Sequence, residues 1–350
     1  MTTATTSSSA EERAALRELA DDLFTSITGP HLNDQTTALT STESQWTSLH
    51  ESGLTLLTTP EEYGGNGAGP ADAAIVAERA GYHALPRALG DNDLLGAWLL
   101  YSTGLDVPTG SMVVALTDSD LSGTVEVDSV PFVESSDWLL VVGPGGLAQI
   151  ATSAISATPT PDLGGEQRAR VSFDAAAATV TSLPTDMRPE VRLRGALVRS
   201  WQISGAVQRC LDLAIDHVQT REQFGRPLAR FQAVGQLIAR SAGAVAMART
   251  AADQATSAVA ENGFGAPSTV MAIAAAKIQA GKAATQVARQ THQAHGAIGF
   301  TLDHQLRHFS GRAQAWGRDF GTARAWQREL GSMVLANPAP LWEQISSPSA

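Results

Sequence analysis

Cysteine is nearly absent from this chain of 350 residues, which contains only Cys210. A single cysteine excludes an intrachain disulfide and a metal site built from several thiolates. Because Cys210 falls on the apolar face of a predicted helix, we expect a buried, unreactive thiol. Basic residues are also few: 24 Lys and Arg face 35 Asp and Glu, for a formal charge of −11. This balance argues against a nucleic-acid partner, because phosphate binding needs a basic surface.

Long hydrophobic runs are missing as well. No apolar stretch reaches the roughly 18 residues that span a membrane, and residues 1–9 lack the basic and apolar regions of a secretory signal. With 43% hydrophobic residues and a mean hydropathy of −0.05, the composition is typical of water-soluble proteins. We therefore expect a cytoplasmic protein with no membrane partner.

Hydrophobic periodicity divides the chain into three parts. Helical spacing dominates the first part, which Ser9 and Glu12 open with a capping box. Short apolar runs such as 112–116 and 138–142 then alternate with Gly, Pro, Asp and Ser, which predicts a small antiparallel β domain. The predicted organisation is a tail at 1–9, a helical domain at 10–106, a β domain at 107–192, a four-helix bundle at 193–335 and a tail at 336–350.

The last part returns to the helical period. Four long amphipathic stretches with short joints predict an antiparallel bundle. The expected helices cover 194–219, 231–261, 268–292 and 302–330. An interruption of the last one near Gly311 or Gly317 is left open. The predicted fold class is therefore α+β, mainly α.

Two loop motifs occupy the joints of this bundle. Arg221-Glu-Gln-Phe-Gly-Arg-Pro-Leu228 follows the first helix, and Gln293-Ala-His-Gly-Ala-Ile-Gly-Phe300 follows the third. In an up-and-down bundle both joints lie at the same end. There an arginine could fork onto a phosphate, a glutamine amide could bind a purine or phosphate edge, and a glycine lets a ligand approach the backbone. The alternative is ordinary turn chemistry with a solvated arginine.

The layout and its motifs resemble the acyl-CoA dehydrogenase family. Three segments carry the resemblance: Pro60-Glu-Glu-Tyr-Gly-Gly to the family's N-terminal loop, Arg221-x-x-Phe224-Gly225 with Phe231-Gln232 to its Arg-x-x-Phe-Gly…Gln segment, and Gln293-x-x-Gly296 with Gly299-Phe300 to its Gln-x-x-Gly-Gly-x-Gly segment. The resemblance is clearest over 193–330, fair over 10–105 and weak in the β region. It implies an FAD enzyme that oxidises acyl-CoA thioesters to enoyl-CoA, with an electron-transfer flavoprotein as electron acceptor.

The resemblance also implies a set of cofactor residues. In family tetramers the flavin ring rests on one subunit's β domain, while the neighbouring subunit holds the ADP end of the FAD. Carried over, Arg221 would contact the pyrophosphate, and Gln293 would hold the ADP end. Ala297 stands where the family has a second glycine, which puts the tightest backbone contact in question. The six predicted cofactor residues are Arg221, Gln223, Phe224, Leu228, Gln293 and Gly296.

The sequence departs from the family at the catalytic base. The usual glutamate lies in the last bundle helix, nine residues after an arginine, and counting from Arg307 gives Trp316. Other members place it at the start of the first bundle helix, which here is Gly195. Neither residue can accept a proton, so no catalytic residue is predicted. Glu190 and Asp319 are the nearest carboxylates, each offset by several residues.

The β region departs as well. The family holds the flavin ring with a Thr-Glu-Pro-Gly-Ala-Gly-Ser-like strand and loop followed by a Trp-x-Thr strand. Here the corresponding strand reads Val113-Val-Ala-Leu-Thr-Asp-Ser-Asp120, and no Trp-x-Thr follows. The half of the site that would hold the ring is therefore expected to be lost or reduced.

These departures predict an accessory subunit. The chain keeps the segments that serve a neighbour's flavin and lacks those that would serve its own. It resembles the shorter, base-lacking subunit of actinobacterial heteromeric (α₂β₂) acyl-CoA dehydrogenases of sterol degradation, which pair with a catalytic subunit. One alternative is a self-sufficient homomeric enzyme with a displaced base at Glu190 or Asp319. Another is a flavin-free structural or assembly protein on the same fold.

No metal site is predicted. His304 and His308 lie one helical turn apart and could share a metal, but the sequence offers no HExxH frame and no obvious third ligand. Hydrogen-bonded or solvated histidines are therefore the preferred interpretation.

Overall fold

The computed structural model describes residues 9–35, 38–162, 164–340 and 342–343, so that most of the two predicted tails, 1–8 and 344–350, lies outside the described residues. The N-terminal part contains α1 (Ala10–Thr28), α2 (Glu43–Glu51), α3 (Pro70–Tyr82), a π-helical segment (Asp91–Ala97) and α4 (Trp98–Ser102). The predicted capping box of α1 is confirmed, because the Ser9 and Glu12 side chains each accept a hydrogen bond from the other's backbone N–H.

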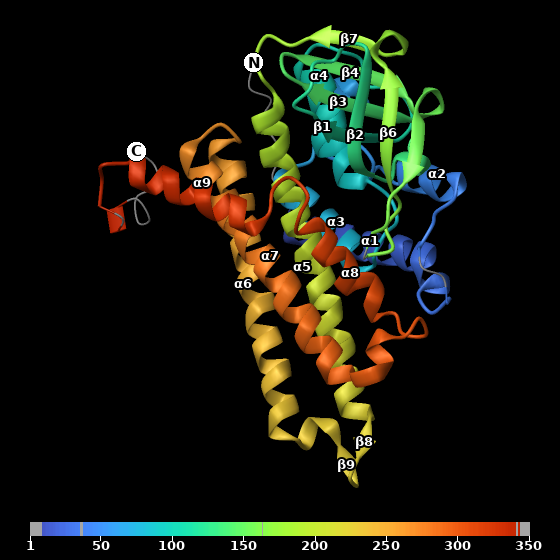
Figure 1. Cartoon of the computed structure of the whole chain (residues 1–350). Coiled ribbons are helices and arrows are strands. Elements are labelled where there is room, and N and C mark those ends of the chain that lie inside the picture. The colour runs from blue at the N-terminus through green and yellow to red at the C-terminus, as the bar shows by residue number, and fades with distance from the viewer. Residues whose placement is uncertain (1–8, 36–37, 163, 341, 344–350) are drawn as a thin grey trace.

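The middle part is a β domain of two sheets (Figure 1). The first sheet has the strand order β1-β3-β4-β7 and the second the order β2-β6-β5. The strands are β1 (Met112–Leu116), β2 (Thr124–Pro131), β3 (Trp138–Gly143), β4 (Gly146–Ala151), β5 (Ser156–Pro159), β6 (Arg168–Asp174) and β7 (Thr179–Ser182). The expectation of a purely antiparallel domain was wrong at one place, because β1 pairs with β3 in parallel.

The apolar runs of β1 and β3 are continuous because both faces of their sheet are covered. Val113 and Ala115 pack between the two sheets, whereas Met112 and Val114 join the core that the sheet shares with the helices. In β3, Leu139 packs between the two sheets and Leu140 joins the core shared with the helices. A parallel pair buried on both sides reads as an unbroken hydrophobic run, which hides the period of two.

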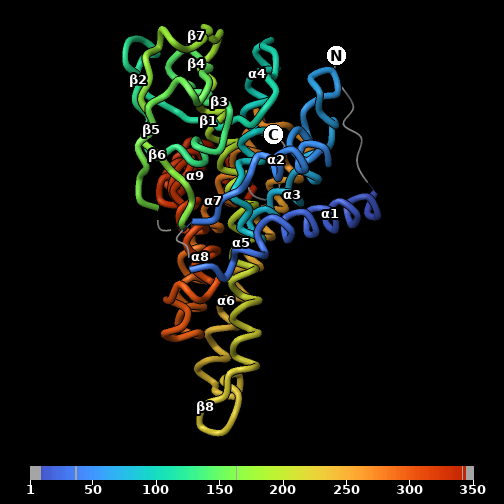
Figure 2. Tube along the Cα trace, turned by 90° about the vertical axis from the view of Figure 1, so that its right-hand side faces the viewer, coloured from blue at the N-terminus to red at the C-terminus, as the bar shows by residue number. Residues whose placement is uncertain are grey.

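The C-terminal part is built around one long helix. The helices are α5 (Arg188–Thr220), α6 (Gln232–Asn262), α7 (Pro267–His295), α8 (Leu306–Trp316) and α9 (Ala323–Ala336), and a short hairpin of β8 (Glu222–Gln223) and β9 (Arg226–Pro227) joins α5 to α6. The predicted domain boundary at 192/193 falls inside α5. Figure 2 shows α5, α6 and α7 running side by side to the β8–β9 end.

The predicted fourth bundle helix is two helices. Gly317 ends α8, and Phe320 and Gly321 then adopt positive φ angles of 53° and 104° that turn the chain. Gly311, the other position left open, lies inside α8. After the turn α9 packs on α7, where Ala323 meets Gly281, and it leaves the line of the bundle (Figure 1).

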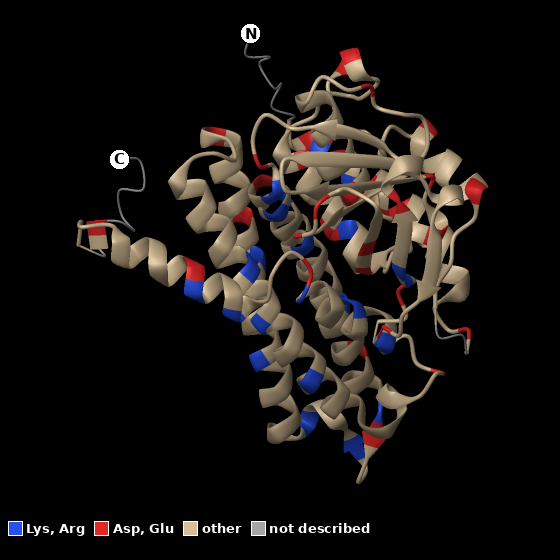
Figure 3. Cartoon of the chain, turned by 45° about the horizontal axis from the view of Figure 1, so that its top comes forward, with Lys and Arg blue, Asp and Glu red and all other residues tan. Residues whose placement is uncertain are grey.

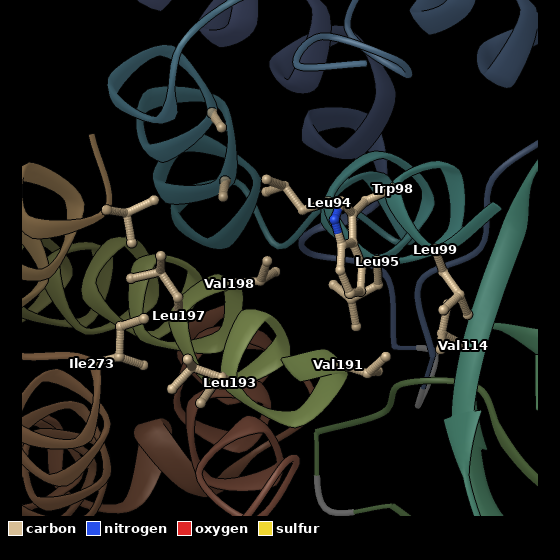
Figure 4. Packing of buried hydrophobic residues seen from close by; sticks show 14 of the residues in the cluster. Leu94, Leu95, Trp98, Leu99, Val114, Val191, Leu193, Leu197, Val198 and Ile273 are labelled. Atoms are coloured by element: carbon tan, nitrogen blue, oxygen red, sulfur yellow. The ribbon is translucent and has the colours of Figure 1, made fainter. Parts of the chain in front are cut away.

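The N-terminal helices lie against α5 through small residues. A Cβ on Gly205 would overlap the carbonyl oxygen of Glu78 in α3, and one on Gly81 would overlap that of Gln202. Beside this crossing, Leu94 and Trp98 meet Val198 and other buried side chains of α5 (Figure 4). Cys210 is buried in α5, and burial raises the pKa of its thiol, as expected for an unreactive thiol. Among the described residues, no helix has the length and apolar character that crossing a membrane requires.

Candidate functional site

The structure brings the two bundle motifs to the same end, as predicted. The last turn of α5 meets the last turn of α7, because the His217 ring stacks on the His295 ring with centroids 4.5 Å apart. Arg221 follows His217 by one helical turn, and Gln293 precedes His295 by two residues. The β8–β9 hairpin extends the chain beyond this contact (Figures 1 and 2). We call this region, residues 217–231 and 292–305, the bundle end.

The predicted cofactor residues at the bundle end are open to solvent. Arg221, Gln223, Gln293 and Gly296 are exposed, and Leu228 is half-buried. Phe224 is 93% exposed and has a φ of +53°, which is an uncommon conformation for an aromatic residue. Phe300, in the other motif, is 75% exposed. Side chains this apolar and this exposed indicate a surface that another molecule covers.

The Arg221 guanidinium forms no ion pair within the described part of the chain, neither with Glu222 nor with Asp216. Gly296 caps α7 with a φ of +67°, and the space around its Cα is open. This pattern suits ligand binding better than internal turn chemistry. The C-terminal helices are also rich in basic residues: residues 221–330 contain 13 Lys or Arg and 6 Asp or Glu, and Figure 3 shows blue ribbon segments along these helices.

Histidine rings pack together at the bundle end. His304 contacts His295 edge to face at 4.6 Å, and His292 lies against Phe300 at 4.7 Å. Burial and the neighbouring histidines lower the pKa of His304 to about 4, and burial also lowers the pKa of His217, His292 and His295. His308 instead bonds to Arg307. Within the described residues no group of three or more His, Cys, Asp or Glu could hold a metal ion.

A second arrangement lies where the β domain meets α5. The Asp319 carboxylate accepts hydrogen bonds from Arg168 of β6, at 3.0 and 2.9 Å, and from Arg199 of α5, at 2.9 Å. Arg199 also forms a bidentate pair with Asp91 of the π-helical segment, at 2.7 and 2.8 Å. These four side chains are almost fully buried. We call them the junction network.

Arg168, Arg199 and Asp319 of the junction network line a small cavity together with residues of β1 and β2. The cavity between β1, β2 and this network has a volume of only about 160 Å³, below the roughly 300 Å³ at which small-molecule sites begin. Burial opposes ionisation of Asp319, but Arg199 and Arg168 outweigh it and keep the pKa of that carboxyl below its usual value. A carboxylate held in this way is a poor proton acceptor.

Trp316 and Gly195, the two positions to which the family resemblance assigns the base, are both tightly packed. Trp316 is 1% exposed, and its indole N–H donates to the Glu166 carboxylate at 2.7 Å. At Gly195 a Cβ would overlap the ring of Phe320. Glu190, the other displaced carboxylate considered, accepts two hydrogen bonds from Arg194, at 3.1 and 2.9 Å, in the first turns of α5.

Sequence reasoning missed most members of the junction network. Arg168, Arg199 and Asp91 lie in three separate elements, and no motif or spacing links them. The only available signal was the rarity of charged residues inside apolar runs, since Arg199 follows Ala196-Leu197-Val198. Glu166 was missed for the same reason. In the structure, burial raises the pKa of the Glu166 carboxyl, whereas the charge of Arg168 acts to lower it.

Comparison with known proteins decides the family. The acyl-CoA dehydrogenase N-terminal domain matches residues 10–106, and the acyl-CoA dehydrogenase C-terminal domain matches residues 194–331. The chain belongs to the acyl-CoA dehydrogenase family. The residues between these two matches contain the β domain, where the sequence resemblance is weakest.

Similar family members come from mycobacteria. The acyl-CoA dehydrogenase IpdE2 of Mycobacterium tuberculosis is 29% identical over 94% of this chain and 99% of its own. IpdE2 of Mycolicibacterium smegmatis is 31% identical over 81% of this chain and 85% of its own. The first alignment therefore spans nearly the whole length of this acyl-CoA dehydrogenase chain, and the second spans about four fifths of it.

Solved structures share the fold. A chain of the Tcur3481-Tcur3483 steroid acyl-CoA dehydrogenase, in its G363A variant, superposes with a TM-score of 0.77 at 23% identity and covers 93% of this chain and 98% of its own. A chain of the ChsE4-ChsE5 complex from Mycobacterium tuberculosis gives a TM-score of 0.74 at 21% identity, with 95% and 99% coverage. The predicted fold class is confirmed.

Proposed function

We infer that this chain is the accessory subunit of a heteromeric, FAD-dependent acyl-CoA dehydrogenase. The observation that carries the proposal is the contrast between an open bundle end and a filled junction. An FAD whose ADP end lay on this chain would have to place its flavin ring elsewhere, on the β domain of a catalytic partner. The partner would also supply the base, because Trp316 and Gly195 occupy the two usual base positions.

The residues present fit the ADP half of the cofactor. Arg221 is exposed and offers a bidentate guanidinium to a pyrophosphate. Gln293 offers an amide donor and acceptor, and the positive φ of Gly296 turns its backbone outward without a side chain. Phe224 and Leu228 provide apolar surface, and Gln223, next to Phe224 in the chain, adds an exposed amide. When bound, FAD supplies the oxidising flavin that accepts a hydride from the acyl chain.

The partner and the substrate are proposed from the relatives. Two of the superposed chains come from structures named for pairs of proteins, and one of these pairs is called a steroid enzyme. We propose an α₂β₂ complex that desaturates an acyl-CoA thioester of a sterol side chain and passes its electrons to an electron-transfer flavoprotein. A panel of steroid and straight-chain acyl-CoA esters of equal carbon number, assayed with the complex, tests the substrate class.

The experiment that tests the role is a comparison of two purifications. This chain is purified alone and after co-expression with a longer acyl-CoA dehydrogenase homologue from the same organism, and the flavin absorbance is measured per mole of protein. We expect a colourless isolated chain and a yellow complex with about one FAD per pair of chains. A full complement of FAD in the isolated chain contradicts the accessory role and favours the homomeric alternative.

A matched pair of variants assigns the cofactor residues. In the complex, Arg221→Ala removes a charge-assisted bond to phosphate and should lower FAD retention roughly 10-fold or more. Arg324→Ala removes an equally exposed arginine of α9 and should leave retention unchanged. A complex that forms normally but carries no FAD, with or without the Arg221→Ala change, would favour the flavin-free structural alternative.

A further inference from the structure

A separate cavity lies on another side of α5. Its volume is about 610 Å³, within the roughly 300–1,000 Å³ typical of small-molecule sites. The loop 58–70, α4, α5 and the α6–α7 connection form its walls. It shares no lining residue with the junction cavity. On α5 it is lined by Arg194 and Trp201, two helical turns apart, whereas Arg199 faces the junction network.

Leu94, Tyr101, Trp201 and Phe264 form an aromatic and apolar part of its wall, and Thr58, Glu61, Glu62, Asn66 and Arg194 contribute polar groups. The Trp201 indole N–H already donates to Thr256, at 2.8 Å, so Trp201 offers the cavity only apolar surface. Tyr101 is held in place by stacking on Tyr63, with ring centroids 5.2 Å apart. These walls favour a flat or compact apolar ligand.

Two of the lining residues, Arg194 and Tyr101, carry hydrogen-bond donors. The Arg194 guanidinium lies between the rings of Trp98 and Phe264, at 3.8 and 3.9 Å. Its Nε and Nη2 donate to Glu190, which leaves Nη1 without a hydrogen-bond partner among the described residues. The Tyr101 hydroxyl likewise has no partner there. Both residues line the cavity, so a ligand oxygen could accept from both.

The charges around the cavity restrict the ligand further. Glu190 neutralises Arg194, and the exposed Glu61 and Glu62 stand at the rim. An anionic ligand would meet two carboxylates and find no uncompensated positive charge. A cation would bring no acceptor to Arg194 and Tyr101. A neutral molecule with a carbonyl oxygen satisfies both donors and avoids both penalties.

We propose that this cavity binds a neutral, largely apolar carbonyl compound, whose oxygen accepts hydrogen bonds from Arg194 and Tyr101. The site needs neither FAD nor a partner chain, so the test of this proposal does not depend on the proposed accessory role. Ligand binding here would connect the loop 58–70 to α5 and the α6–α7 connection.

The test uses the full chain and 4-phenylcyclohexanone as the probe. Saturation-transfer NMR detects binding, and calorimetry gives the dissociation constant. The matched anion, 4-phenylcyclohexanecarboxylate, should bind at least several-fold more weakly. Failure of the ketone to bind at millimolar concentration, or equal binding of the anion, overturns the proposal.

Three variants locate the probe. Tyr101→Phe should weaken ketone binding roughly 3- to 10-fold, the value of one neutral hydrogen bond. Tyr63→Phe removes the hydroxyl of the stacked ring, which does not line the cavity, and should change nothing. Ala68→Phe should fill the cavity and abolish binding. If this last variant does not fold, the two tyrosine variants decide: equal affinities for both contradict the site.

Discussion

Arginine is used in opposite ways at the bundle end and at the junction between the β domain and α5. Arg221 is exposed and has no ion-pair partner among the described residues, whereas Arg199 is 1% exposed and bonds to Asp91 and Asp319. A buried arginine that is paired with carboxylates of its own chain holds elements of the fold together. An exposed arginine without such a pair is available to bind another molecule. Under the proposed function, this contrast would separate the half of a cofactor site that the chain offers from the half that it lacks.

Removing the central arginine of the junction network should have the largest effect. Arg199→Leu leaves the buried Asp91 carboxylate without its partner and removes one of the two arginines that bond to Asp319. Breaking a buried pair from one side costs about 3–5 kcal/mol. Urea denaturation of the isolated chain measures the free energy of unfolding. Arg192→Leu, which breaks the more exposed pair with Glu329, should cost less than about 1 kcal/mol. Equal losses in the two variants would mean that the network does not hold the junction together.

The tight packing around Gly195 gives the next effect. A methyl group on Gly195 overlaps the Phe320 ring, so Gly195→Ala should lower the free energy of unfolding by about 1–3 kcal/mol. Because the clash is with one ring, the double variant Gly195→Ala/Phe320→Leu should lose less than the sum of the two single changes. Additive losses would contradict the overlap. The same denaturation curves provide all three values.

The contrast also explains what the sequence could and could not predict. The bundle end is built from contiguous motifs on helices whose period is plain, so the amino-acid sequence alone places Arg221 and Gln293 at one end of the bundle. The junction network joins β6, α5, the π-helical segment and the turn after α8, and no local pattern encodes such a meeting. The break after Trp316 was equally hard to predict, since a glycine can end a helix or lie inside it, as Gly311 does.

Acid should affect the bundle end through its histidines. Burial lowers the pKa of His304 to about 4 from an unfolded value of 6.5. The neutral form is therefore the one that folding favours. The contribution of the neutral His304 ring to the free energy of unfolding is complete above pH 6.5. It is lost as the pH falls from 6.5 towards 4, because the unfolded chain takes up the proton first. The free energy of unfolding should fall across this window.

A histidine variant assigns this acid effect. His304→Phe should flatten the loss of stability between pH 6.5 and 4, and His31→Phe, an exposed residue outside the bundle end, should leave it as it is. Urea denaturation at several pH values provides the comparison. An unchanged acid profile in His304→Phe would assign the loss to other groups.

The smallest expected effect comes from two helical glycines, one with open space around it and one in close contact with another helix. Gly243 lies inside α6 with nothing within 4 Å of a Cβ, so Gly243→Ala should stabilise the isolated chain by about 0.5–1 kcal/mol through the better helix propensity of alanine. Gly205→Ala makes the same change in α5, where the methyl group overlaps the backbone of α3, and should destabilise the chain. Opposite signs in thermal unfolding would confirm that α5 packs closely on α3 and that this face of α6 is open. If Gly243→Ala stabilises the isolated chain but weakens the complex, a partner chain covers that face of α6.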